Sequence, residues 1–390
     1  MPVVNRIADR APEIAAWRRD IHAHPEMLFD THRTSALVAD KLRGFGCDEV
    51  VTGLGRTGVV GVIRGRAGGS GRVVGLRADM DALPIVEATG LPHASTVPGT
   101  MHACGHDGHT AMLLGAAQYL AETRNFDGTA IVIFQPAEEG GGGGREMVDD
   151  GLMDRFGIEE VYGLHNMPGL AVGDFAVRPG PMLAASDTIT ITVTGRGGHA
   201  AQPHQTIDPV VAASAIVMAL QSIVARNVDP LKGAVVSITS VVTSSDAFNV
   251  IPEAVEMRGT ARTLDAEVQD LVEARMHALV EATARAYGAE GRLVYERNYP
   301  VTVNAAPQAD FAARVAAEVV GDARVEVDAP PLMGAEDFSY MLNARPGAML
   351  FVGNGDTAKL HHPKYDFNDE LIPVGTSWWV RLIETAMPAA

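Results

Sequence analysis

The stretch VVGLRADMDALP (residues 73–84) sets a short apolar run directly before a cluster of charged residues. Three later segments repeat this order: AIVIFQPAEEG (130–140), VYGLHNMP (161–168) and AMLFVG (348–353), the last before a loop that reaches LHHP (360–363). Short, β-rich apolar runs are typical of strands that are buried on both faces. In an open α/β sheet, sites form beyond the carboxyl ends of the strands, and all four polar clusters fall there. The sequence therefore predicts one site built from four strand ends.

The segments around these runs have helical character. Between the first two runs, GHTAMLLGAAQYLAE (108–122) combines the apolar spacing and the alanine content of a helix. Residues 14–44 are also predicted to be rich in helix, with a break at His24-Pro25. Strands that alternate with helices predict the α/β class, here as an open mixed sheet with flanking helices.

The middle of the chain has a different pattern. In DTITITVTG (187–195) apolar residues alternate with threonine. This period of two is typical of a strand with one buried and one solvent-exposed face. From there to residue 298 the predicted elements run β-α-β-β-α-β, an α+β arrangement of the ferredoxin-like kind. We therefore expect residues 184–298 to form a smaller domain, inserted into a larger one made of residues 1–183 and 299–390.

Composition narrows the class of protein. A chain of 390 residues has room for two domains with separate cores. Its net charge of −17 argues against binding to nucleic acid or to anionic membranes. No run approaches the roughly eighteen apolar residues of a membrane span, and the N-terminal stretch lacks the apolar core of a signal peptide. Cys47 and Cys104 are the only cysteines, so a disulfide scaffold is excluded and the expected location is the reducing cytoplasm.

The densest cluster of chemically active residues is MHACGHDGHT (101–110). Thiolate, imidazole and carboxylate groups are the ligands that borderline divalent cations accept. Cys104 and His106 are two residues apart, so on extended backbone they share a face. Glu138 and Glu139 are adjacent, so on extended backbone one could bind a metal while the other faces a substrate. Further imidazoles follow the later runs, at His165, His361 and His362.

Each cluster taken alone has an ordinary structural explanation. A Glu-Glu pair usually begins a solvated helix, a histidine after a strand is commonly a capping or surface residue, and a lone cysteine behaves as a small apolar residue. The glycine run 140–144 lacks the Gly-Lys-Ser/Thr ending of a phosphate-binding loop, so it predicts a turn. The common position of the clusters at strand ends favours a metal site. Two other hypotheses stay open: Cys104 as a nucleophile with His106 or His109 as its base, and a metal-binding or dimerising protein without catalysis.

Eight motifs in one order also resemble a known family. They are RADMDALP, MHACGHDGHT, FQPAEEG, GLHN, GRGGHAAQPH, NVIPEAVEMRGTARTLD, MGAEDFSYM and LHHPKYDFNDE. Together they resemble the metal-dependent amidohydrolases of the aminoacylase and hippurate hydrolase kind, which include plant indole-3-acetyl-amino-acid hydrolases and belong to the dinuclear metallopeptidase superfamily. The resemblance runs from about residue 14 to residue 386. It implies a two-metal catalytic domain and an inserted lid or dimerisation domain.

The resemblance implies roles for individual residues of the larger domain. Cys104 matches a thiolate that bridges two metal ions, and the other matching ligands are His106, Glu139, His165 and His361. Glu138 matches the general base, and Asp81 matches a carboxylate that orients a metal ligand. One departure is His362, where relatives often have asparagine.

Three residues of the smaller domain match substrate contacts. His199 matches a histidine that reaches the reacting carbonyl, in some relatives from the partner subunit. Asn249 and Arg262 lie in a motif that contacts the substrate carboxylate in relatives. His102 and His109 are expected to be structural, because five ligands with a bridging water already fill two metal sites.

The implied reaction is metal-dependent hydrolysis of the amide bond of small N-acyl-L-amino acids, which yields a carboxylate and a free amino acid. A divalent cation lowers the pKa of water towards about 7, Glu138 would take up the proton, and His199 would donate a hydrogen bond to the oxyanion. Zinc or manganese is the expected metal, with cobalt or nickel also compatible. The chain is expected to form a homodimer or homotetramer. A dipeptidase or carboxypeptidase on the same scaffold is the main alternative, although Cys104 in place of a bridging aspartate favours the acyl-amino-acid enzymes.

Overall fold

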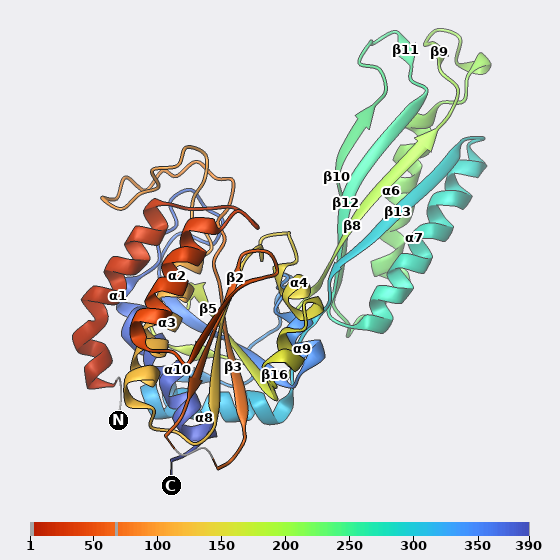
Figure 1. The fold of residues 1–390 in the computed structure, drawn as a ribbon. Coiled ribbons are helices and arrows are strands. Elements are labelled where there is room, and N and C mark those ends of the chain that lie inside the picture. Colours follow the sequence, from red (N-terminus) through yellow and green to blue (C-terminus); the bar gives the residue numbers. More distant parts are fainter. Residues whose placement is uncertain (1–3, 67–68, 390) are drawn as a thin grey trace. The chain divides into compact units, whose positions relative to one another are not determined.

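The computed structural model of the chain describes residues 4–66 and 69–389 (Figure 1). The chain divides into two compact units: unit 1, which comprises Met1–Met182, Val303–Pro330 and Asp337–Ala390, and unit 2, which comprises Leu183–Thr302 and Pro331–Glu336. Unit 2 thus extends beyond the predicted segment 184–298 and takes in the separate segment 331–336. That segment joins unit 2 because the backbone N–H of Ala184 donates to the carbonyl oxygens of Leu332 and Gly334.

Unit 1 is built around an eight-stranded mixed sheet. In spatial order its strands are β1 (Glu49–Leu54), β2 (Gly58–Arg64), β4 (Thr129–Gln135), β3 (Val73–Asp79), β5 (Glu160–Pro168), β16 (Gly347–Gly355), β6 (Phe175–Ala176) and β15 (Val325–Glu326). The central strands β4, β3, β5 and β16 are parallel to one another, whereas β1, β2 and β6 pair antiparallel. The carboxyl ends of the central strands therefore meet at one edge of the sheet, and the predicted fold class is confirmed.

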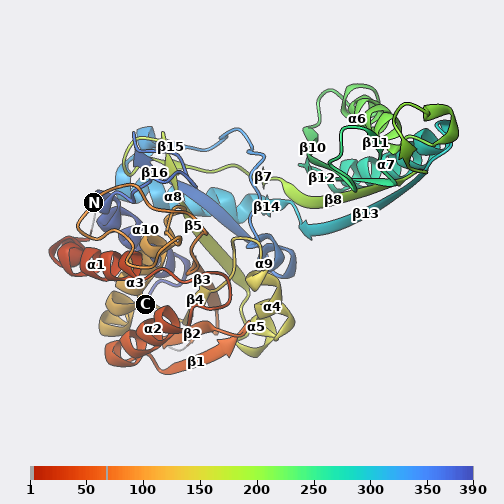
Figure 2. The ribbon, with the colours of Figure 1, turned by 90° about the horizontal axis from the view of Figure 1, so that it is seen from above.

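Continuous apolar runs explain why the central strands are buried. Every residue of β16 is buried, and neither β3 nor β4 has an exposed residue. Strands covered on both faces carry such runs instead of alternating patterns. Figure 2 shows helices on both sides of the sheet of unit 1. One set is α1 (Asn5–Ala23), α2 (His32–Phe45), α3 (His106–Thr123), α8 (Ala306–Val320) and α10 (Ile372–Ala386), and the other is α4 (Gly143–Asp149), α5 (Leu152–Arg155) and α9 (Ser339–Ala344).

The first helix ends where the sequence predicts a break. Helix α1 stops at Ala23, and His24 leaves the helical conformation with φ −128° and ψ 58°. The residue before a proline is disfavoured in the helical region, which explains this end point. The helix begins at Asn5, well before the predicted residue 14.

Helix α3 positions the cluster MHACGHDGHT. It begins at His106, so the helix starts inside this motif and not at Gly108. Helices α1, α2 and α10 pack around α3, and most of its residues are buried. A Cβ atom at Gly108 would lie 2.2 Å from the ring of Phe367, so glycine is needed for the chain after β16 to approach the helix. His106 is thereby held at the end of a rigid, buried element.

Unit 2 follows the predicted order β-α-β-β-α-β. Its elements are β8 (Ala185–Thr194), α6 (Pro209–Arg226), β10 (Ala234–Thr243), β12 (Ala254–Thr263), α7 (Ala266–Ala286) and β13 (Glu290–Tyr299). The strand order is β10-β12-β8-β13, and every neighbouring pair is antiparallel. In β8 the residues Ile189, Ile191 and Val193 are fully buried, as the period-two pattern predicts. Asp208 and Asp265 cap the N-termini of α6 and α7 by accepting hydrogen bonds from backbone N–H groups.

Two short ribbons and three single turns complete the fold. Strands β9 (Gly198–His199) and β11 (Val250–Ile251) pair beyond one end of the sheet of unit 2 (Figure 1). Strands β7 (Gly180–Leu183) and β14 (Thr302–Asn304) form a separate pair. Turns of 3-10 helix occupy Pro203–Gln205, Asp322–Arg324 and Asp369–Leu371.

Helix α6 corrects one expectation. Within residues 4–66 and 69–389 it is the single helix with the length and apolar composition of a membrane span, whereas the sequence analysis expected no such segment. Its inner face is buried in the core of unit 2 through Ala212, Ala213, Ile216 and Leu220. Core helices of soluble proteins can have the same length and composition, and α6 is packed on its inner face and apolar on its outer face.

Candidate active site

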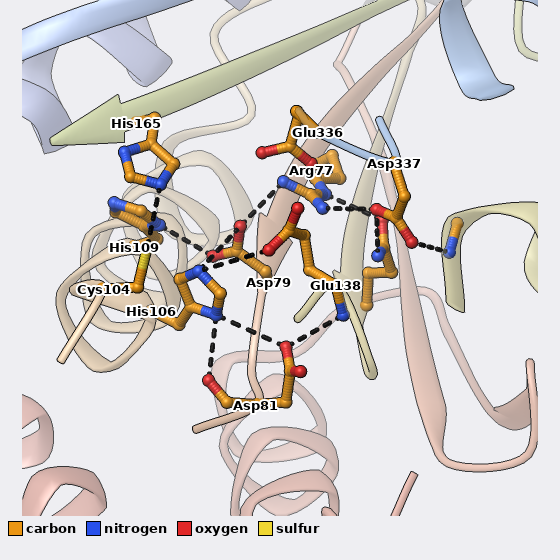
Figure 3. Close-up of polar contacts among 12 residues, drawn as sticks. Arg77, Asp79, Asp81, Cys104, His106, His109, Glu138, His165, Glu336 and Asp337 are labelled. Carbon is orange, nitrogen blue, oxygen red and sulfur yellow. Dashed lines mark hydrogen bonds and ion pairs between the residues drawn. The ribbon is translucent and has the colours of Figure 1, made fainter. Parts of the chain in front are cut away.

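The five predicted metal ligands converge in unit 1, at the carboxyl ends of the central strands. They are Cys104, His106, Glu139, His165 and His361. The ligand atoms of Cys104, His106 and His165 lie within 4.8 Å of one another, and so do those of Cys104, Glu139 and His361. Cys104 belongs to both groups, which is the geometry that a bridging ligand requires. Figure 3 shows its sulfur facing the ring of His165, with Sγ and Nε2 3.5 Å apart.

Asp81 holds two parts of the cluster in place. Its carboxylate accepts the backbone N–H groups of Glu138, at 3.0 Å, and of Glu139, at 3.1 Å. Its backbone carbonyl accepts a hydrogen bond from His106 Nδ1 at 2.9 Å (Figure 3). Because a carbonyl can only accept, Nδ1 of His106 carries a proton, and Nε2 is the ring nitrogen that faces the cluster. Asp81 therefore orients His106, the residue that the resemblance implies to be a metal ligand.

His165 and His361 are oriented by backbone contacts. His165 Nδ1 donates to the carbonyl oxygen of Asn166 at 2.7 Å, which leaves Nε2 with its lone pair towards Cys104. The backbone N–H of His361 donates to the carbonyl oxygen of Ala103 at 2.7 Å, so the loop after β16 is tied to the Cys104 segment. His361 Nε2 lies 3.3 Å from Glu139 Oε1.

Two observations indicate that cations complete this cluster. Within the described part of the chain, the buried atoms His106 Nε2 and Glu139 Oε1 have no hydrogen-bond partner. Leaving such an atom unsatisfied costs about 1–3 kcal/mol. Burial alone would lower the pKa of His106, but Asp79 and Asp81 outweigh it and raise that pKa to about 10. The site thus attracts positive charge, and the residues present fit divalent metal ions.

The geometry argues against Cys104 as a nucleophile. Burial, together with Glu139, raises the pKa of the Cys104 thiol, whereas an activated thiol needs a lowered pKa. His109 is not available as its base, because His109 Nδ1 lies 2.7 Å from Asp79 and Nε2 accepts the backbone N–H of Asn166 at 3.0 Å. These contacts hold His109 between Asp79 and Asn166.

Two strained backbone positions lie beside the cluster. Ala137 has φ +55° and His361 has φ +63°, and both are non-glycine residues in the left-handed region. The glycine run 140–144 forms the turn that the sequence predicts and then opens helix α4. A Cβ atom at Gly143 would lie 1.8 Å from the carbonyl oxygen of Pro136, so this tight return of the chain after Glu138 and Glu139 requires glycine.

The three predicted substrate contacts lie in unit 2 and do not come together there. His199 and Asn249 are neighbours, since the N–H of Ala200 donates to the carbonyl oxygen of Asn249 at 3.0 Å. Both belong to the end of the sheet where Ala254 pairs with Thr194. Arg262 lies eight residues further along β12, which is roughly 27 Å at about 3.4 Å per residue. Unit 2 therefore presents the predicted substrate contacts at two opposite ends of its sheet.

Asp79 also belongs to the site, although it was not predicted from the sequence. Asp79 lies between two histidines: Oδ1 is 2.7 Å from His109 Nδ1, and Oδ2 is 3.6 Å from His106 Nε2 (Figure 3). Arg77 donates to the same carboxylate at 2.8 Å. The period-two spacing of Asp79 and Asp81 in RADMD was the available signal, because it places both carboxylates at the end of one strand.

The fold and the cluster together define a class of metal-dependent hydrolases with the site at the strand ends of an α/β sheet. Residues 75–385 match the family described as peptidase family M20/M25/M40, and the chain belongs to this family. It is a hydrolase of amide C–N bonds in small molecules, and divalent metal ions are its cofactors. The family resemblance given by the eight motifs is thereby confirmed.

Individual relatives share nearly the whole chain. It is 43% identical over 382 residues to the hippurate hydrolase of Campylobacter jejuni, and the match covers 98% of both chains. It is 39% identical to the thermostable carboxypeptidase 1 of Saccharolobus solfataricus, over 96% of both chains. Its structure is similar to that of the YXEP protein of Bacillus subtilis, a dinuclear metal binding peptidase from the M20 family. That similarity has a TM-score of 0.84 at 34% identity and covers 98% of this chain and 100% of the other.

A buried ionic network anchors the first turn of α3 next to the cluster. His22 Nδ1 lies 2.9 Å from Asp107 Oδ2, and Arg18 Nη1 lies 3.5 Å from the same oxygen. His22 Nε2 lies 3.5 Å from Glu87. Burial alone would lower the pKa of His22, but Asp107 and Glu87 outweigh it and raise that pKa to about 9. The network joins α1 to the residue that follows His106.

We predict that the free energy of unfolding falls as the pH rises from about 7 to about 10. The contribution of charged His22 is complete below an unfolded-state pKa of about 6.5 and is lost as the pH passes about 9. This shift corresponds to a loss on the order of 3 kcal/mol. Urea unfolding at several pH values measures it, and His22→Gln should flatten the dependence. His32→Gln, at an exposed helix position, should keep the wild-type slope; equal slopes in all three proteins would contradict the assignment.

Proposed function

We propose that the protein hydrolyses the amide bond of N-acyl-L-amino acids and releases a carboxylic acid and a free amino acid. The observation that carries this proposal is the pair of ligand groups that share Cys104, with Glu138 beside them. The 43% identity to a hippurate hydrolase over 98% of both chains supports the substrate class, because hippurate is an N-acyl amino acid.

The proposed cofactor is a pair of divalent cations per subunit. Cys104 would be shared by both cations, and the other ligands would be His106, Glu139, His165 and His361. Bound in this cluster, the cations supply Lewis acidity, which makes water nucleophilic near neutral pH and polarises a carbonyl. A thiolate favours zinc, and the mixed imidazole and carboxylate ligands also suit manganese, cobalt or nickel. The free thiols of Cys47 and Cys104 suit a reducing compartment, which we take to be the cytoplasm.

Glu138 is the proposed general base. Its backbone is fixed by Asp81, its side chain is buried, and its Oε2 lies 3.9 Å from His106 Nε2. In the reaction the water oxygen forms a bond to the carbonyl carbon while Glu138 takes up a water proton. The C–N bond then breaks, and Glu138 returns the proton to the leaving nitrogen. Glu139 has a different role, because its carboxylate faces His361 and the Cys104 sulfur.

The proposed partner of the substrate carboxylate is Arg262. Its guanidinium is half buried, and burial lowers its pKa. No hydrogen bond or ion pair of this side chain occurs with the residues that the structure describes, so a carboxylate could bind it in the two-pronged geometry that arginine favours.

A carboxypeptidase or dipeptidase activity is the second candidate, favoured by the 39% identity to a thermostable carboxypeptidase over 96% of both chains. Both activities cleave the C–N bond of an amino acid with a free carboxylate, so they differ on the acyl side only. The test is the kcat/KM of zinc- or manganese-loaded protein on hippurate, on N-acetyl amino acids and on dipeptides with a free amino group. We expect the N-acylated substrates to be preferred, and a chelator to abolish turnover until divalent metal is added. A preference for free dipeptides, or a rate of hydrolysis that does not change when the chelator is added, would refute the proposal.

We predict that Glu138→Gln lowers kcat by about 10²- to 10⁴-fold while the protein keeps its bound metal. The amide cannot accept the proton, but the residue is not a proposed ligand. The adjacent Glu139→Gln is the matched comparison: it should lose metal as well as activity. Metal content after dialysis and hydrolysis rates measure the two effects. Wild-type turnover by Glu138→Gln would show that another group is the base.

We also propose that two copies of the chain associate through the edge strand β10. The strand has no charged residue, and Val241 and Val242 are 58% and 59% exposed. The opposite edge, β13, carries Arg292, Glu296 and Arg297, which protect an edge from pairing. Helix α6 contacts β10 and adds exposed apolar side chains, among them Met218 at 73%. An uncharged edge beside an apolar helix face suits pairing with a second copy.

The long distance between two proposed substrate contacts within unit 2 supports the same association of two copies. His199 and Arg262 lie too far apart on one copy of unit 2 to contact one small substrate. In a dimer, the two copies could supply one contact each.

We predict that Val241→Lys on β10 converts the dimer to a monomer and lowers hydrolysis with it, because two lysines would meet at the paired edge. Val294→Lys on β13, where the native side chain is 41% exposed, is the matched control and should leave both properties unchanged. Light scattering after size exclusion gives the mass. A wild-type monomer at micromolar concentration, or a dimeric Val241→Lys protein, would contradict the interface.

A further inference from the structure

Asn166 connects the segments that carry three of the proposed ligands. It follows His165 on β5 and is fully buried. Its Nδ2 donates to the backbone carbonyl of Cys104 at 2.6 Å, and its Oδ1 accepts the hydroxyl of Tyr365 at 2.7 Å. Its own carbonyl accepts His165 Nδ1 at 2.7 Å. Tyr365 belongs to the same loop as His361, so the amide of Asn166 joins its own segment to two others that are far away in the sequence.

The contacts of Asn166 fix the orientation of its amide. The carbonyl oxygen of Cys104 can only accept a hydrogen bond, so the NH₂ group must face it. The reversed amide would place two acceptors against each other. An aspartate has the same shape but no N–H group, so it cannot make the bond to Cys104. The contact therefore requires an amide at this position and is not a matter of packing alone.

Asn166 also fixes the proton on His109. His109 Nε2 accepts the backbone N–H of Asn166 and lies 3.0 Å from its Nδ2. The proton of His109 must then be on Nδ1, where it is donated to Asp79 at 2.7 Å. Asp79 in turn lies 3.6 Å from His106 Nε2. Hydrogen bonds from one residue therefore lead to Cys104 directly and to the neighbourhood of His106 through His109 and Asp79.

The glycine between two proposed ligands is explained by Asn166. Gly105 has φ +95°, and a Cβ atom there would lie 2.2 Å from Asn166 Nδ2 and 2.6 Å from the Tyr365 hydroxyl. The sequence Cys-Gly-His thus leaves room for the amide to reach the carbonyl of Cys104. The conformation of the loop at Gly105 and the position of the Asn166 amide therefore depend on each other.

From this arrangement we infer that Asn166 is a positioning residue of the metal centre: it fixes the Cys104 loop, and with it the direction of the sulfur, before any cation binds. The inference rests on the metal centre of the proposed function and assigns Asn166 no contact with substrate. Residues that orient ligands in this way typically change metal affinity by about 10- to 100-fold when they are replaced.

The test compares Asn166→Asp with Asn304→Asp. Asn304 is also a buried amide of unit 1, and its Nδ2 donates to the carbonyl oxygens of Arg178 and Met349, away from the cluster. Both changes keep the shape and remove donors to backbone carbonyls. Each variant is made in a Cys47→Ser background, so that Cys104 is the one remaining thiol. Each protein is titrated with Co²⁺, and the thiolate-to-cobalt charge-transfer absorption is recorded.

We expect Asn166→Asp to bind Co²⁺ about 10- to 100-fold more weakly and to lose charge-transfer intensity. In the metal-free protein its Cys104 should react faster with a thiol reagent, because the loop is no longer held. Asn304→Asp should match wild type in both measurements even where thermal unfolding shows a similar loss of stability. Tyr365→Phe leaves the hydrogen bond from Asn166 to Cys104 in place. It should change cobalt binding and thiol reactivity in the same direction as Asn166→Asp, but by less.

The outcomes separate this inference from the proposed function. Wild-type cobalt affinity and thiol reactivity in Asn166→Asp would overturn the role of Asn166, and so would equal losses in Asn304→Asp or larger losses in Tyr365→Phe. Absence of a charge-transfer band in the wild-type protein would refute Cys104 as a metal ligand. In that case the thiol reactivity of the metal-free proteins still decides whether Asn166 fixes the Cys104 loop.

Discussion

The site depends on one constraint: several carboxylates share a buried space. They are Asp79, Asp81, Glu138 and Glu139, each about one-tenth exposed or less. Like charges at this distance repel, and a low local dielectric strengthens the repulsion. Asp81 is satisfied by two backbone N–H groups, and Asp79 by Arg77 and His109. Among the proposed metal ligands, two buried atoms are without a hydrogen-bond partner in the described structure, His106 Nε2 and Glu139 Oε1, and this is where the proposed cations would bind.

The location of this site could be predicted because strand ends are visible in the sequence. The central strands carry apolar runs that stop abruptly at polar residues, as at Arg77 in β3 and at Gln135 in β4. Parallel strands bring their carboxyl ends to one edge, so residues separated by long stretches of chain become neighbours. The same reasoning could not give the order of the strands. The motifs supplied that step for the ligands, since they resemble a family in which the same clusters bind metal.

Contacts between side chains could not be predicted from the position of strand ends in the sequence. Asp79 and Asn166 stand next to residues that the sequence analysis singled out, yet their partners are set by packing: His109 lies on α3 and Tyr365 lies in the loop after β16. The motif NVIPEAVEMRGTARTLD shows the opposite error. It contains both Asn249 and Arg262, which suggests one binding site, but most of the motif is the extended strand β12. A strand separates the residues of a motif by roughly 3.4 Å per position, so its two ends lie far apart.

The strained backbone at the cluster is held in place by hydrogen bonds between neighbouring segments. Left-handed conformations at Ala137 and His361 cost on the order of 1–3 kcal/mol each, and they persist where the surroundings determine them. His361 is held by its hydrogen bond to Ala103, and Ala137 accepts the N–H of Gly143 at 3.2 Å. These hydrogen bonds tie the loop after β16 to the segment that precedes Cys104 and close the turn that follows Glu138 and Glu139. Contacts between segments of unit 1 that are far apart in the sequence therefore determine the backbone on which the proposed ligands stand.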